Sequence, residues 1–166
     1  MTERATAGDT GREPDEHARF ARYRRAFDAV TAEDAPALVT RVLADPDPVP
    51  GPANSAVRAY LDRRAAELLT TPGYPSWCAE LTGPVEADAF SARRLREWTL
   101  LRAMTLGEPW EAEALLAATN WLQLRTAETC PSAGALRTLA AGGRTRRIRV
   151  AARARLSAER LDLDRT

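Results

Sequence analysis

The sequence WTLLR at residues 98–102 recurs as WLQLR at residues 121–125 and, more loosely, as TRRIR at residues 145–149. Each copy ends in an aliphatic residue followed by arginine, and the three aliphatic-arginine pairs lie 23 and then 24 residues apart. A period of this length is typical of helical units that stack side by side and bury a shared apolar face. The repeat therefore predicts an architecture, and it carries no chemistry of its own.

Helical spacing of apolar residues extends along most of the chain. Phe20, Tyr23, Phe27 and Val30, for example, recur at steps of three and four residues and form one apolar face. No segment shows the period-two alternation of a half-buried strand, so we expect an all-α fold. Its eight or nine short helices are expected at about 15–30, 34–43, 54–69, 76–82, 86–106, 109–118, 120–127, 132–141 and 145–159.

Several helix ends are marked by residues that favour such positions. The expected N-caps, whose side chains accept a backbone N–H bond, are Asp34, Asn54 or Ser55, Ser76, Asn120, Ser132 and Thr145. Pro109 is expected in the first turn of the helix that carries Trp110, and Gly107 just past the end of the long helix before it. The connection between the first two helices is very short, so these helices should form a hairpin.

The chain is expected to form one domain. Residues 1–14 are polar and aperiodic and predict a disordered leader, residues 15–160 predict a single α-helical repeat domain, and residues 161–166 predict a frayed tail. The segment 45–52 contains four prolines and should be an exposed linker. The N-terminus lacks the apolar segment of a signal peptide, and no apolar run approaches the ~18 residues that span a bilayer. We therefore expect a cytoplasmic protein with no membrane association.

Residue types that usually carry catalysis or bind metals are scarce. Cys78 and Cys130 are too few for a disulfide framework, and His17 is the only histidine, so a zinc site would lack ligands. No P-loop, dinucleotide-binding or metalloprotease motif occurs. The sequence thus predicts no metal, no cofactor and no catalytic set.

Residues 121–156, WLQLRTAETCPSAGALRTLAAGGRTRRIRVAARARL, resemble HEAT-like repeats and, more closely, the shorter leucine-rich repeat variant. Leu124-Arg125 and Ile148-Arg149 match the hydrophobic-arginine pair of that family, and 136–140 matches its second helical segment. The resemblance implies a small α-solenoid of stacked HEAT-like helical pairs. It transfers no site residue, because such repeats share no active site.

The same resemblance implies a structural role for the repeated arginines. In such repeats the arginine of the pair reaches a carboxylate or a helix end of the neighbouring unit, and we expect this of Arg102 and Arg125. Trp98 and Trp121 occupy equivalent positions in the repeat. These two rings are therefore expected to meet in the core between units.

The charge distribution gives the strongest functional candidate. All 24 basic residues are arginine, and residues 133–166 hold nine of them against three acids, with no acid between Glu128 and Glu159. Arg146, Arg149 and Arg153 should lie within about 60° of one another on the last helix. The candidate partner-binding residues are Trp110, Arg144, Arg146, Arg147, Arg149 and Arg153.

These features favour a non-catalytic protein-protein interaction module, a scaffold or adaptor, whose partner has an acidic surface. The alternative is a nucleic-acid-binding HEAT-like protein, such as a DNA-base glycosylase, because a basic helix face also binds phosphates. A third hypothesis is an enzyme or small-ligand module with a pocket around Tyr74, Trp77 and Trp98, although aromatic connections more often seal the end of a core.

Overall fold

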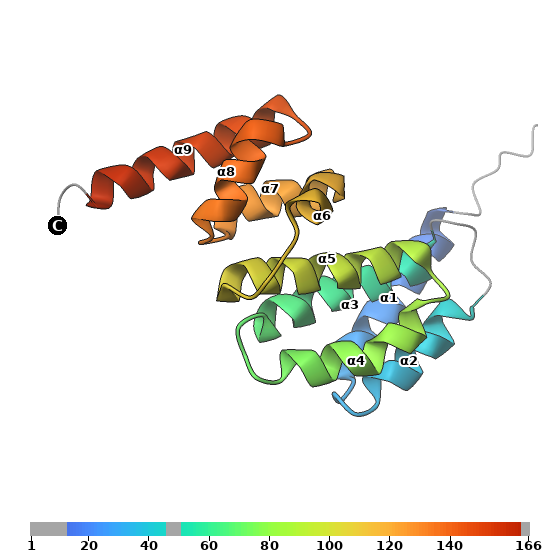
Figure 1. The fold of residues 1–166 in the computed structure, drawn as a ribbon. Coiled ribbons are helices and arrows are strands. Elements are labelled where there is room, and N and C mark those ends of the chain that lie inside the picture. Colours follow the sequence, from blue (N-terminus) through green and yellow to red (C-terminus); the bar gives the residue numbers. More distant parts are fainter. Residues whose placement is uncertain (1–12, 46–50, 164–166) are drawn as a thin grey trace, which may run out of the picture. The chain divides into compact units, whose positions relative to one another are not determined.

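The computed structural model describes residues 13–45 and 51–163, and every regular element in these two ranges is an α-helix (Figure 1). The predicted all-α fold is therefore confirmed for the described residues. Nearly all of the expected leader and most of the proline-rich linker lie outside them. The helices are α1 (Glu13–Ala29), α2 (Ala35–Leu43), α3 (Pro52–Leu68), α4 (Tyr74–Val85), α5 (Ala89–Leu106), α6 (Ala112–Ala117), α7 (Asn120–Thr129), α8 (Ala133–Gly142) and α9 (Arg146–Leu163).

The described chain divides into two compact units. Unit 1 contains the residues up to Arg64 together with Ser76–Ala92, and unit 2 contains Ala65–Pro75 together with the residues from Arg93 onward. The single repeat domain expected over 15–160 stays a prediction.

Unit 1 is organised by aromatic and aliphatic residues of its first helices. α1 and α2 contact each other as the predicted hairpin, and Tyr23 and Phe27 of the predicted apolar face are buried. The Phe27 ring stacks on that of Tyr60, with 4.9 Å between the ring centroids. Arg63 forms an ion pair with Asp28 and donates a hydrogen bond of 3.1 Å to the Phe27 carbonyl in the last turn of α1. This arrangement ties α3 to α1.

Two helices of unit 1 begin earlier than the sequence predicted. α3 begins at Pro52, so the predicted cap at Asn54 or Ser55 was wrong. The proline fits the first turn because its missing N–H would have no partner there. α4 begins at Tyr74 and continues to Val85, so the predicted start at Ser76 and stop at 83–84 were also wrong. Pro84 lies inside the helix, in its last turn, and cannot donate an N–H bond to the carbonyl four residues earlier.

Helix α5 begins at a buried capping group. Asp88 Oδ2 accepts hydrogen bonds from the Ser91 backbone N–H at 3.0 Å and from the Ser91 hydroxyl at 2.6 Å. This pair starts the helix at Ala89 and not at the predicted residue 86. Burial raises the pKa of Asp88, but the hydrogen bonds from Ser91, from the Asn54 side chain and from the Phe90 backbone together bring it below its ordinary value of 3.8.

Helix α5 ends at Leu106, and Gly107 follows it as predicted. Gly107 has a φ of +72°, in the left-handed region that favours glycine. The Glu108 N–H donates a hydrogen bond of 2.9 Å to the Ala103 carbonyl, which closes a Schellman motif. The chain therefore turns sharply away from the α5 axis.

Unit 2 contains the repeat, and its last four helices pack on one another. α9 contacts α7 and α8, while α6 contacts α7 and α8 (Figure 1). The fully buried side chains of these helices are Leu115, Leu122, Gln123, Thr126, Ala127, Ala135, Leu136, Leu139 and Ala152, with Ile148 almost as deep.

The buried amide of Gln123 satisfies backbone groups of two connections. Its Nε2 donates hydrogen bonds to the carbonyls of Leu115 at 3.0 Å and Leu116 at 2.9 Å, with a longer one of 3.4 Å to Ala118. Its Oε1 accepts a hydrogen bond of 2.8 Å from the Arg144 backbone N–H. The open carbonyls at the end of α6 and the α8–α9 connection are thus held by one side chain of α7.

The observed caps of α8 and α9 are the predicted ones, whereas the cap of α7 and the end of α9 differ from the prediction. Ser132 and Thr145 cap α8 and α9 as predicted, each accepting a backbone N–H bond of 3.3 Å from three residues ahead. The cap of α7 is Thr119 and not the predicted Asn120. α9 extends to Leu163, beyond the predicted end at about 159.

Helix α6 is shorter than predicted. It begins at Ala112, after an extended Glu111 with φ −104° and ψ 130°. Pro109 and Trp110 therefore lie in the connection before the helix, and the predicted position of Pro109 in its first turn was wrong.

Replacing Asp88 by asparagine should remove part of the acid sensitivity of the fold. The lowered pKa of Asp88 stabilises the fold fully at pH values above the ordinary pKa of 3.8. This stabilisation is lost as the pH falls through the lower pKa of the folded state. Asparagine still caps a helix, so Asp88→Asn should fold and lose about 0.5–1 kcal/mol at pH 7. Urea unfolding from pH 7 to pH 3 checks this, and an unchanged pH slope in the variant would contradict it.

Replacing Gln123 by leucine should lower the free energy of unfolding by about 2–4 kcal/mol, because four buried or partly buried backbone groups each lose a hydrogen bond to its side chain. Asn120→Ala, a change of an exposed residue in the first turn of the same helix, is the control and should have an effect within about 0.5 kcal/mol. Urea denaturation of both variants measures the difference. Equal urea midpoints for the Gln123→Leu and Asn120→Ala variants would show that the hydrogen bonds of Gln123 do not stabilise the fold.

Candidate functional site

The two tryptophans of the repeat meet in unit 2 as the sequence predicted. The rings of Trp98 on α5 and Trp121 on α7 lie 5.3 Å apart between centroids, in an edge-to-face arrangement at 63°. The Arg94 guanidinium lies 3.6 Å from the centre of the Trp121 ring, and that of Arg125 lies 4.6 Å from the centre of the Trp98 ring. These cation-π contacts hold α5 against α7.

Two arginines of the repeat bond carbonyls at helix ends. Arg102 donates to the carbonyl of Leu69, just past the end of α3, so it reaches a helix end as predicted, and that this helix belongs to a neighbouring repeat unit stays a prediction. Arg149 donates a hydrogen bond of 2.6 Å to the carbonyl of Gly143, which follows α8. For Arg125 the predicted partner was wrong, because the guanidinium contacts the Trp98 ring and not a carboxylate or a helix end.

Gly143 brings the start of α9 close to the end of α8. A Cβ atom there would lie 2.6 Å from the Leu139 carbonyl oxygen and 2.8 Å from Ile148 Cγ2, so no other residue fits without a shift. This close approach positions the Arg149 guanidinium on the Gly143 carbonyl.

The remaining arginines of the predicted basic face differ in how firmly they are held. Arg153 donates a hydrogen bond of 2.9 Å to the Ala140 carbonyl in the last turn of α8. Arg147 forms an exposed ion pair of 3.6 Å with Glu128, which contributes little in water.

Arg144 is exposed and contributes its backbone N–H to Gln123. Arg146 is exposed and has no hydrogen bond or ion pair within the described part of the chain.

The outer face of α9 also carries an apolar residue that sequence reasoning missed. Val150 is 52% exposed, and it lies four residues after Arg146 and three before Arg153, on the same side of the helix. We call these three residues, with Arg147, the α9 outer face. A valine among arginines gives no signal in the sequence, because an aliphatic residue in a helix is normally expected to be buried.

Trp110 does not belong to α9; it lies in the connection before α6 and is half-buried. A Cβ atom on Gly134 would be 3.7 Å from its Cζ2 atom, so the indole packs against the first turn of α8. Part of its surface is therefore used in unit 2 itself.

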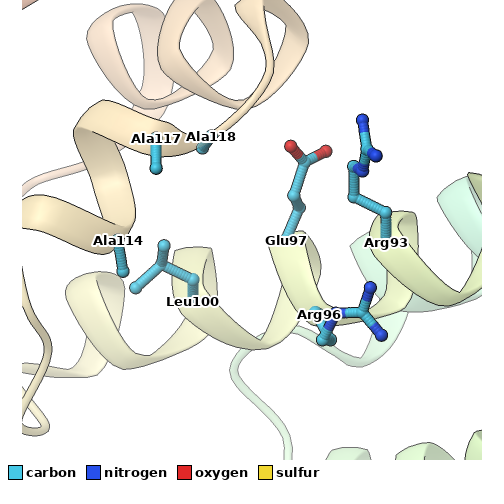
Figure 2. Close-up of a pocket in the computed structure, with 7 residues that line it drawn as sticks. All are labelled: Arg93, Arg96, Glu97, Leu100, Ala114, Ala117 and Ala118. Atoms are coloured by element: carbon cyan, nitrogen blue, oxygen red, sulfur yellow. The ribbon is translucent and has the colours of Figure 1, made fainter.

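A groove between α5 and α6 was not predicted. It has a volume of about 390 Å³ and is open to solvent. Figure 2 shows side chains of α5 on one side and three alanines from α6 and its end on the other; the lining residues are Arg93, Arg96, Glu97, Leu100, Ala114, Ala117 and Ala118. We call it the α5/α6 groove.

Glu97 is the buried acid of this groove. Its side chain is only 6% exposed, and its Oε1 accepts a hydrogen bond of 2.8 Å from the backbone N–H of Thr119, the N-cap of α7. A carboxylate at this position is stabilised by the positive end of the α7 dipole. The charge of Glu97 is therefore used to join α5 to α7.

The described side chains contain no cluster that could hold a metal ion, and the expected aromatic pocket is not present among them. Within residues 16–45 and 51–158, whose side chains are described, no three His, Cys, Asp or Glu residues come close enough to hold a metal ion. Tyr74, Trp77 and Trp98, the expected lining of a pocket, are each buried in the core of their own unit. In the same ranges no helix is both long and apolar enough to cross a membrane.

Comparison with protein-family models, with curated proteins and with solved structures finds no match to this chain. The functional inference therefore rests on the side chains of the α9 outer face and the α5/α6 groove.

The structure separates a structural arginine from a free one on the same helix. Arg149→Met should lower the free energy of unfolding by about 1–2 kcal/mol, because the Gly143 carbonyl loses a charged donor. Arg146→Met should leave it within about 0.5 kcal/mol. Thermal or urea unfolding of the two variants tests this, and equal losses would mean that the bond to Gly143 contributes nothing.

Proposed function

We propose that the chain is a non-catalytic protein-interaction module that binds an acidic protein surface through the α9 outer face. The proposal rests above all on Val150, whose exposed side chain is surrounded by arginines on one side of a helix. Interfaces between proteins combine an apolar centre with a polar rim, and arginine is enriched in them.

The charges of this face favour an acidic partner. Arg146 has no partner in the described residues, and the ion pair of Arg147 with Glu128 is exposed and easily exchanged. Arg153 is exposed although one of its nitrogens is bonded to Ala140. Such cations bind carboxylates through paired N–H donors and accelerate association with an acidic surface.

The exposed valine favours a protein over a nucleic acid as the partner. Phosphate contacts need cations only, and an aliphatic side chain at the centre of the face adds nothing to binding a phosphate backbone. A protein partner can cover the valine with an apolar side chain of its own, which removes its surface from water.

We further propose that unit 2 is built as a short HEAT-like α-solenoid. The support is the repeated use of one motif position: Arg102 and Arg149 each bond a carbonyl at the end of an earlier helix, and Arg125 reaches the Trp98 ring of the preceding copy. In such stacks each unit is stabilised by its neighbours, and the last helix leaves one face for a partner.

Affinity capture from native cell extract tests the function. The variant Arg146→Glu/Val150→Ser should lose the retained partner, with about tenfold or greater weakening if the face is central to the interface. Glutamate at the first position of α9 interacts favourably with the helix dipole, so the variant should remain folded. Arg24→Glu, an exposed change in the middle of α1, is the matched control. If all three preparations retain the same proteins, the α9 outer face is not the interface.

Filter binding across a salt series distinguishes the nucleic-acid alternative. Three or four phosphate contacts would give a log-log salt slope of about −3 to −4 on duplex DNA. We expect no such binding to duplex or single-stranded DNA at physiological salt. Tight binding that Arg146→Glu abolishes and Val150→Ser leaves unchanged would replace the protein partner by a nucleic acid.

A further inference from the structure

The α5/α6 groove combines an apolar floor with two cations. Arg93, Arg96, Glu97 and Leu100 follow one another at steps of three, one and three residues and so share one side of α5. The opposite wall consists of alanines, whose side chains are too short to fill the space (Figure 2). The volume of about 390 Å³ is within the range of about 300–1,000 Å³ typical of ligand clefts.

The unbalanced charge of the groove is positive. Arg93 and Arg96 are exposed, and neither has an acidic partner among residues 16–45 and 51–158, whose side chains are described. The one acid in the lining, Glu97, is engaged with the N-terminus of α7. An occupant should therefore bring a carboxylate to the arginines and aliphatic groups to Leu100 and the alanines.

We infer that the α5/α6 groove is a second binding site, which takes a short peptide segment of a partner protein with alternating aliphatic and acidic residues. A peptide fits because the groove is open to solvent, so a chain longer than the groove can extend beyond it while one side chain enters. A small ligand that depends on its aliphatic part would need a more enclosed cavity, since such ligands are mostly buried when bound.

This site is independent of the proposed function, because its residues lie on α5 and α6 and none of them belongs to the α9 outer face. Loss of one site should leave the other intact. The two proposals can therefore fail separately.

Fluorescence anisotropy with synthetic peptides tests the groove in the full chain. The probe is a fluorescein-labelled octapeptide of alternating leucine and glutamate, and its counterparts replace every glutamate by lysine or every leucine by serine. We expect the leucine-glutamate peptide to bind about tenfold or more tightly than either counterpart, as expected when one aliphatic side chain is buried beside a paired carboxylate. No binding of this peptide, or equal binding of all three, would overturn the inference.

Two variants locate the binding. Ala117→Leu places a larger side chain in the open groove, and Arg93→Gln/Arg96→Gln removes the cations while keeping good helix formers. Each should weaken binding of the leucine-glutamate peptide by about tenfold or more. Ala66→Leu, an exposed alanine of α3 outside the groove, is the matched control, and Arg146→Glu should also have no effect. Unchanged binding by Ala117→Leu would show that the peptide binds elsewhere.

Competition with octanoate separates a peptide from a free aliphatic carboxylate. Octanoate should displace the peptide only at concentrations far above that of the peptide, because it makes a single carboxylate contact. Displacement by octanoate at concentrations similar to the peptide's own Kd would overturn the peptide inference in favour of a small-molecule site.

Discussion

Unit 2 depends on a single buried amide. Gln123 has no exposed surface, and its side chain bonds the carbonyls at the end of α6 and the backbone N–H that opens the α8–α9 connection. A helix as short as α6 is marginal by itself, and Gln123 supplies donors to the carbonyls of Leu115 and Leu116 at its end. The position of α6, and with it one wall of the α5/α6 groove, therefore rests on α7. Gln123 also holds the connection before α9, because its Oε1 accepts a hydrogen bond from the Arg144 backbone N–H.

Arginine has two different roles in this chain although every cation is an arginine. Arg102 and Arg149 act within the fold, because they supply donors to carbonyls that helix ends leave open. Arg94 and Arg125 lie over indole rings and join α5 to α7. Arg93, Arg96 and Arg146 have no such contact in the described part of the chain. The α5/α6 groove and the α9 outer face thus each carry arginines that the fold does not use, and both proposals build on these.

The two proposed surfaces fit acidic partners in different ways. The α9 outer face presents an exposed valine between arginines, so the proposed partner would supply the apolar surface that covers it. The α5/α6 groove supplies the pocket itself and requires a partner that supplies the side chain. Both use modest charge with a small apolar area, which is the chemistry of reversible recognition.

The sequence by itself determined the all-α class, most helix positions, the α1–α2 hairpin and the meeting of Trp98 with Trp121, because these follow from apolar spacing and from a repeat within the chain. It also located the basic C-terminal region. It did not determine that Arg149 is bonded to Gly143, that Val150 is exposed, or that alanines of α6 leave a groove beside α5. Only the tertiary structure decided these, because the exposure of a helical residue depends on which neighbouring helix covers it. Gln123 shows the same limit: a polar residue between two leucines predicts nothing until the carbonyls it bonds are in place.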